Sequence, residues 1–105
     1  NYGEINIDTE KISSIDIKYM NKTNSRKLKV YFITDREKQA SEKNSFEIEV
    51  APMSNSVVNY SIDAGKNENW KGILKKLIIV PEANAHGSIS FDSISLALKN
   101  SEDTQ

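Results

Sequence analysis

The chain has 105 residues, no cysteine, 14 Lys and Arg against 15 Asp and Glu, and a formal net charge of -1. This length is enough for one domain with one hydrophobic core, and neither disulfides nor thiolate chemistry are available to it. The balanced charge and the lack of an apolar run of about 20 residues lead us to expect neither nucleic acid nor membrane as a partner.

The first half of the chain alternates apolar and polar residues, which is the period of a β-strand with one buried face. Residues 5–8 alternate weakly and predict an edge strand. Two clearer runs, 15–20 and 28–33, flank an Asn-, Thr- and Ser-rich turn and predict an antiparallel pair. The side chains expected to point inward are Ile15, Ile17, Tyr19, Leu28, Val30 and Phe32.

A charged loop over residues 35–44 leads into two more alternating runs. The first, residues 46–50, points Phe46, Ile48 and Val50 inward. The second, residues 58–62, does the same with Val58, Tyr60 and Ile62. Both runs predict short strands.

The stretch from Trp70 to Leu96 organises the rest of the fold. An apolar run stops at Pro81, and a polar loop turns at Gly87 into a second run. Short runs rich in Ile and Val, bounded by Gly and Pro, predict a β-hairpin. The apolar spacing widens to three residues between Leu74 and Leu77 and between Phe91 and Ile94, so we predict a β-bulge at each place.

Six or seven short strands, with no amphipathic helix and no internal repeat, indicate an all-β fold. We expect an antiparallel β-sandwich, a jelly roll, formed by a single domain over residues 1–99. Residues 100–105 are expected to be a disordered tail or the start of a linker.

Short motifs follow one another in the second half: Tyr60-Ser-Ile-Asp63, Trp70-Lys-Gly72, Leu77-Ile-Ile79 with Pro81, Gly87-Ser-Ile89 and Phe91-Asp-Ser-Ile94-Ser-Leu96. This order resembles the galactose-binding-like jelly-roll domains of bacterial secreted polysaccharide-active and surface proteins. The resemblance covers roughly residues 12–98 and implies a carbohydrate-binding-module-like domain that is extracellular or on the cell surface.

The chain departs from the family pattern at two places. Ile78 and Val80 stand where the pattern has Arg and Asp, so apolar residues replace a polar strand end. The family also has more sequence before the position of Lys11, so a first strand is expected to be missing or reduced. The fixed positions of the motif are core and turn residues, which specify a fold better than a ligand.

Tyr31 is the leading candidate for sugar binding because it alternates with Val30 and Phe32 and so points away from the core. We expect it to share an open sheet face with Lys29 and Asn59, where an aromatic plane lies beside hydrogen-bonding groups. Trp70 is a second candidate for stacking on a pyranose, although a Trp-x-Gly motif before a strand suits a loop anchor better. Arg36, in the adjoining loop, completes the candidates.

Catalysis and metal binding find little support in the sequence. Glu47 and Glu49 share one strand face, but nothing apolar nearby would raise the pKa of either carboxyl, as glycosidase chemistry requires. His86 has no nucleophile motif to serve. Asp8, Glu10 and Asp63 are oxygen donors without the spacing of a calcium loop. We expect no enzyme activity and no cofactor; a structural calcium, which many relatives carry, is left open.

Two functions therefore follow from the sequence. The first is a non-catalytic carbohydrate-binding module that targets a larger secreted protein to a polysaccharide or glycan. The second is a structural β-sandwich spacer that packs against a neighbouring domain without glycan binding, in which case Tyr31 and Ile33 lie beneath that partner.

Overall fold

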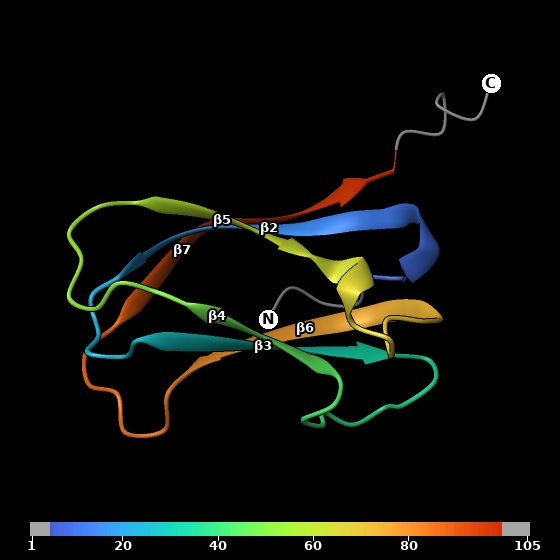
Figure 1. Cartoon of the computed structure of the whole chain (residues 1–105), viewed down its shortest axis with the longest axis horizontal. Coiled ribbons are helices and arrows are strands. Elements are labelled where there is room, and N and C mark those ends of the chain that lie inside the picture. The colour runs from blue at the N-terminus through green and yellow to red at the C-terminus, as the bar shows by residue number, and fades with distance from the viewer. Residues whose placement is uncertain (1–4, 100–105) are drawn as a thin grey trace.

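The computed structural model describes residues 5–99, which form an all-β structure of two antiparallel sheets (Figure 1). The sheets lie in two layers, an arrangement compatible with a β-sandwich, and this confirms the predicted all-β class. Within the described residues no helix is long and apolar enough to cross a membrane.

The larger sheet has four strands in the order β1-β6-β3-β4. They are β1 (Ile7–Asp8), β6 (Ile73–Pro81), β3 (Lys27–Thr34) and β4 (Ser45–Glu49). The smaller sheet has three strands in the order β5-β2-β7. They are β5 (Val58–Asp63), β2 (Ile12–Asn21) and β7 (Ile89–Leu98). Two short 3-10 helices, η1 (Thr9–Lys11) and η2 (Ala64–Lys66), lie in the connections.

Two pairings expected from the sequence are wrong. β2 and β3 do not pair, because β2 lies between β5 and β7 while β3 lies between β6 and β4. β6 and β7 form no hairpin either, since the loop between them crosses from one sheet to the other (Figure 1). Alternation shows which face of a strand is buried, but two strands that face one core from opposite sheets alternate in the same way.

Both predicted bulges are confirmed. Along the β3–β6 ladder, Ile33 pairs with Lys76 but the next residue pairs with Leu74, so Lys75 is the extra residue. Along the β2–β7 ladder, Lys18 pairs with Ser93 and the next residue with Phe91, so Asp92 is extra. Each bulge restores the phase that keeps apolar side chains turned inward.

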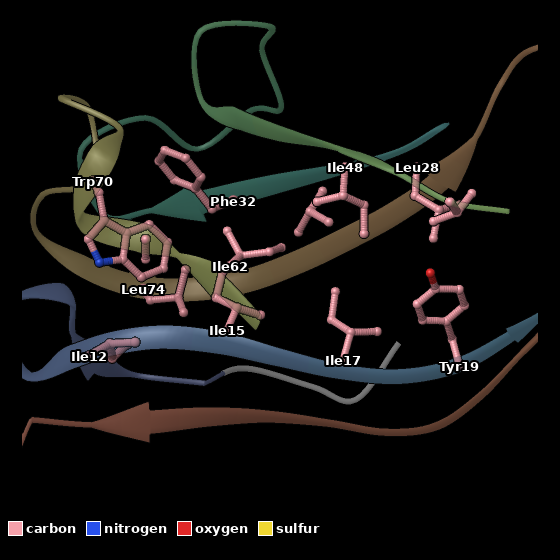
Figure 2. Close-up of a cluster of buried hydrophobic side chains, with 13 residues drawn as sticks. Ile12, Ile15, Ile17, Tyr19, Leu28, Phe32, Ile48, Ile62, Trp70 and Leu74 are labelled. Atoms are coloured by element: carbon pink, nitrogen blue, oxygen red, sulfur yellow. The ribbon is translucent and has the colours of Figure 1, made fainter. Parts of the chain in front are cut away.

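The core lies between the sheets and is supplied mainly by β2 and β3 (Figure 2). Ile15 and Ile17 of β2 and Leu28, Val30 and Phe32 of β3 are all almost fully buried. The inward side chains of β6 and β7 beyond Leu74 are only half-buried. The core is therefore sealed in the middle of the molecule and less completely along its β6–β7 side.

Candidate binding groove on the four-stranded sheet

A groove of about 630 Å³ crosses the outer face of the four-stranded sheet. Tyr31 lies in it because both of its neighbours in β3 are buried, so the alternation of the strand turns this ring outward. β3, β4, the end of β6 and the β6–β7 loop form the walls. The lining residues are Asn24, Ser25, Lys27, Leu28, Lys29, Tyr31, Glu47, Val80, Pro81, Glu82, Ala83, Asn84 and Ala85.

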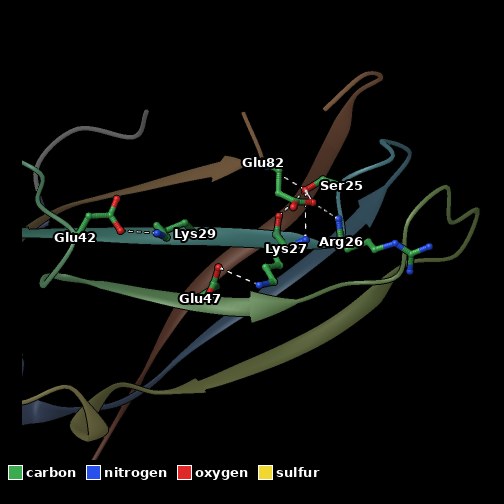
Figure 3. A network of polar contacts seen from close by, with 7 residues as sticks. All are labelled: Ser25, Arg26, Lys27, Lys29, Glu42, Glu47 and Glu82. Carbon is green, nitrogen blue, oxygen red and sulfur yellow. Dashed lines mark hydrogen bonds and ion pairs between the residues drawn. The ribbon is translucent and has the colours of Figure 1, made fainter. Parts of the chain in front are cut away.

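Glu42, in the β3–β4 loop, fixes the Tyr31 ring. The Tyr31 hydroxyl donates to Glu42 Oε2 at 3.0 Å. Lys29 Nζ donates to Glu42 Oε1 at 2.5 Å (Figure 3). The hydrogen bonds from Lys29 and Tyr31 lower the pKa of Glu42, while the same carboxylate raises the pKa of Lys29 and of Tyr31. At neutral pH the ring is therefore held by an ionised partner.

Glu82 fixes the other wall, where the β6–β7 loop begins. Its Oε1 accepts from the Arg26 backbone N–H at 2.7 Å and from Ser25 Oγ at 3.2 Å (Figure 3). The Arg26 N–H, helped by Ser25, lowers the pKa of the Glu82 carboxyl. The Glu82 backbone N–H in turn donates to Ser25 Oγ, so three bonds join this loop to the start of β3.

Asn21 holds the β2–β3 turn beneath this wall. Its side chain is fully buried and makes four hydrogen bonds. Nδ2 donates to the carbonyls of Ser25 and Ala51, and Oδ1 accepts from the backbone and hydroxyl of Thr23. A buried amide with every bond satisfied is a stable anchor for a turn that has no hairpin ladder of its own.

The charges in the groove are nearly balanced. Lys27 lies 3.8 Å from Glu47, and Lys29 is engaged by Glu42 (Figure 3). The side-chain amides of Asn24 and Asn84 add donors and acceptors. A groove that holds an aromatic ring, amides and compensated charges suits a neutral, hydroxyl-rich ligand, held by stacking and hydrogen bonds. Within residues 5–99 no cluster of His, Cys, Asp and Glu is suited to a metal ion.

Asn59 does not join this face, contrary to the sequence prediction. It lies on β5 opposite Lys18 of β2, in the three-stranded sheet, and both side chains are exposed. Asn59 and Tyr31 therefore lie on opposite surfaces of the molecule. The alternation along β5 correctly predicted that Asn59 points outward, but it could not predict to which sheet β5 belongs.

Trp70 is unsuited to sugar stacking because only 6% of it is exposed. Its ring packs edge-on against Phe32 (Figure 2), with centroids 5.0 Å apart and an interplanar angle of 81°. The ring also contacts Phe46. The alternative interpretation of Trp70 as a loop anchor therefore fits its position. Arg36 is exposed just beyond the C-terminal end of β3 and does not line the groove.

The sequence prediction identified Tyr31 and Lys29 but missed the residues that position them. Glu42 lies in a loop whose path no periodicity predicts, and Glu82 and Asn84 lie in a second such loop. Their only sequence signal is a polar side chain in a turn-rich segment, which is equally typical of solvent-exposed loops.

No family model matches the chain, and neither does any curated protein or solved structure.

Proposed function

We propose that the protein is a non-catalytic carbohydrate-binding module whose site is the groove around Tyr31. The observation that supports this most is the Tyr31 ring itself: it is turned outward on a sheet face, hydrogen-bonded to Glu42, and lines one groove together with two asparagines and two lysines. A pyranose presents apolar C–H groups on its faces and hydroxyls at its rim, which matches a ring surrounded by hydrogen-bonding groups.

The proposal includes the setting that the family resemblance implies. The fold would be a variant of the galactose-binding-like jelly roll, in a secreted or surface-located bacterial protein. The module would keep neighbouring domains near a polysaccharide or glycan and so raise their local concentration. The Asp92 bulge falls within Phe91-Asp-Ser-Ile94, one of the motifs on which the resemblance rests.

A glycan array on the purified domain tests the function. We expect binding to at least one neutral glycan class, followed by measurement of the dissociation constant for the best ligand. Tyr31→Phe keeps the ring and loses only the bond to Glu42, so it should bind more tightly than Tyr31→Ala. Failure of every glycan to bind, with a folded protein, would remove carbohydrate recognition from the account.

A spacer function is the second candidate, and the apolar part of the same face supports it. Ile33, Ile78 and Val80 are half-buried on the outer face, and Ile78 is the cross-strand partner of Tyr31. A neighbouring domain of the parent protein packed there would cover them. Hydrogen exchange on the domain alone and within a longer protein distinguishes the two: protection of the β3 and β6 face only in the longer protein would favour the spacer.

A further inference from the structure

Among residues 5–99, one edge of β6 has no paired strand along most of its length. β1 pairs with it only at Ile73 and Leu74, and the last bond on this side runs from the Ile5 N–H to the carbonyl of Lys75. From Lys76 onward no described strand pairs with that edge. Within the described part of the chain, this stretch of β6 therefore presents unpaired backbone groups of the kind that bind another strand.

The hydrogen bonds of β3 show which groups β6 presents at this edge. The Phe32 N–H donates to the Asn44 carbonyl on the β4 side, so the adjacent Tyr31 turns its backbone groups toward β6. Tyr31 is opposite Ile78, which leaves the backbone groups of Leu77 and Ile79 directed to the free edge. Lys75, which accepts from Ile5, has the same phase.

The side chains of this segment are apolar on both faces of the sheet. Leu77 and Ile79 point inward and pack on the core, while Ile78 and Val80 point outward and are half-buried. A run that is apolar on both faces is typical of a strand covered on both sides, not of an edge. Natural edges carry charges, prolines or bulges that prevent pairing, and β6 has its bulge at Lys75 and its proline at Pro81, which leaves residues 77–80 between them without such a device.

An apolar groove of about 720 Å³ lies under the same edge, between β6 and β7. The inward side chains of β1, β6 and β7 line it and are only half-buried: Ile5, Ile7, Leu77, Ile79, Phe91 and Ile94. The core is thus incompletely covered at the place where the β6 edge is unpaired among the described residues. A single added strand could pair with the β6 backbone and also cover the half-buried apolar side chains.

We propose that the occupant is a second copy of this chain, with the two β6 edges paired antiparallel around a two-fold axis at Ile79. An axis perpendicular to the sheet keeps each residue on its own face, so Ile79 faces its counterpart and Ile78 faces Val80 of the second copy. Leu77 then donates its N–H to the carbonyl of Pro81 of the second copy. Pro81 has no N–H to donate, so in this register the pair makes one bond instead of two and the Leu77 carbonyl receives no return bond from Pro81.

The charges select a second copy over an unrelated strand. In this register Lys76 is directly opposite Glu82 of the second copy, and the two-fold axis produces the contact twice. Lys76 makes no ion pair within residues 5–99. Glu82 binds Ser25 and Arg26 through Oε1, so Oε2 is available. The free stretch of β6 thus begins with a cation and ends with an anion, which is self-complementary when antiparallel.

The dimer would join the two four-stranded sheets into one and bring the two apolar grooves together beneath it. The outer faces of the two sheets would point in the same direction, because the axis is perpendicular to the sheet. If the proposed function holds, the two Tyr31 grooves would then face the same side and could engage one polymer bivalently. The pairing itself does not depend on glycan binding.

Sedimentation velocity over a range of concentrations tests the proposal. The wild-type protein should have a sedimentation coefficient that corresponds to twice the mass of the chain, and it should dissociate to the monomer on dilution. Lys76→Glu and Glu82→Lys should each be monomeric at the same concentration, because each places two like charges opposite each other. A mixture of the two variants should recover the dimer, since both contacts are then complementary. Lys71→Glu, the same charge change on an exposed loop residue, should leave the dimer intact.

Ile78→Lys provides a second disruption on the outward face, where the fold does not need the side chain, and melting temperatures establish that each variant is folded. A wild type that is monomeric throughout, or a dimer indifferent to Lys76→Glu and Ile78→Lys, overturns the proposal. So does a protein that dimerises only after residues 1–4 are removed, because the chain would then cover its own edge.

Discussion

The indole Nε1 of Trp70 donates to the backbone carbonyl of Thr9 at 3.1 Å, joining segments 61 residues apart in the chain. That carbonyl also accepts from the Ile12 N–H, which ends η1. Thr9 itself is buried and donates its hydroxyl to the Gly72 carbonyl. Trp70 therefore closes one end of the sandwich, where the N-terminal turn meets the entry to β6.

Replacing Trp70 should destabilise the fold in two distinguishable steps. Trp70→Phe should cost about 1–2 kcal/mol of unfolding free energy, since it removes one hydrogen bond and some volume while Thr9 keeps its bond from Ile12. Trp70→Ala should cost about 3–5 kcal/mol, because it leaves a cavity against Phe32 and Phe46. Urea unfolding followed by circular dichroism measures both. Equal, negligible losses would contradict the anchoring role.

Gly87 allows the β6–β7 loop to pass close to the β2–β3 turn. Its φ is +104°, and a Cβ there would lie 2.7 Å from the Lys22 carbonyl oxygen. Gly87→Ala should therefore lower the unfolding free energy by about 1–3 kcal/mol, combining backbone strain with a clash against main chain.

Gly65→Ala is the matched control for that substitution. A Cβ on Gly65 meets only Asp63 Oδ1, at 3.8 Å, and the residue has no positive φ. The change should be neutral or stabilising by up to about 1 kcal/mol, through the unfolded chain. Comparable losses in both variants would show that the close approach at Gly87 is not the cause.

Acid should release Tyr31 from Glu42. The hydrogen bonds from Lys29 and Tyr31 lower the pKa of Glu42 below the ordinary value of about 4.3. A lowered carboxyl pKa means that the contact is complete above that ordinary value and is lost as the pH falls through the folded-state pKa. Carboxyl ¹³C NMR should show Glu42 titrating low in wild type.

Lys29→Met should move that titration upward, because it removes the largest cause of the shift. Lys71→Met, which removes a charge from a distant exposed loop, should leave it in place. An unchanged Glu42 titration in Lys29→Met would mean that the contact does not persist in solution.

The sequence predicted the faces of the strands better than their partners. Period-two alternation placed Tyr31 outward and Phe32 inward, and the widened spacing around Lys75 located a bulge, because both follow from the pleat of a single strand. Pairing depends on loops that cross between sheets. The β2–β3 turn gives no sign of crossing except the buried Asn21, whose bonds to Ser25 and Ala51 are visible only in three dimensions.

The same limit explains what was predicted of the site. Tyr31 and Lys29 are two residues apart on one strand, so their shared face follows from the sequence. Asn59 points outward as predicted, but it belongs to the three-stranded sheet and not to the sheet of Tyr31. Glu42 and Glu82 reach the groove from loops, whose paths the sequence does not predict. Trp70 was ambiguous between platform and anchor because burial of a loop residue depends on what packs over it, here Phe32 and Phe46.

The measurement that tests the central claim most directly compares glycan binding by wild type, Tyr31→Ala and Asn59→Ala at neutral pH. Tyr31 and Asn59 lie on opposite surfaces, and neither substitution removes a core side chain. The account predicts that Tyr31→Ala weakens binding at least about fivefold, as expected for loss of roughly 1–3 kcal/mol of ring burial, while Asn59→Ala binds like wild type. Binding that survives in Tyr31→Ala and is lost in Asn59→Ala would contradict it and place the site on the three-stranded sheet.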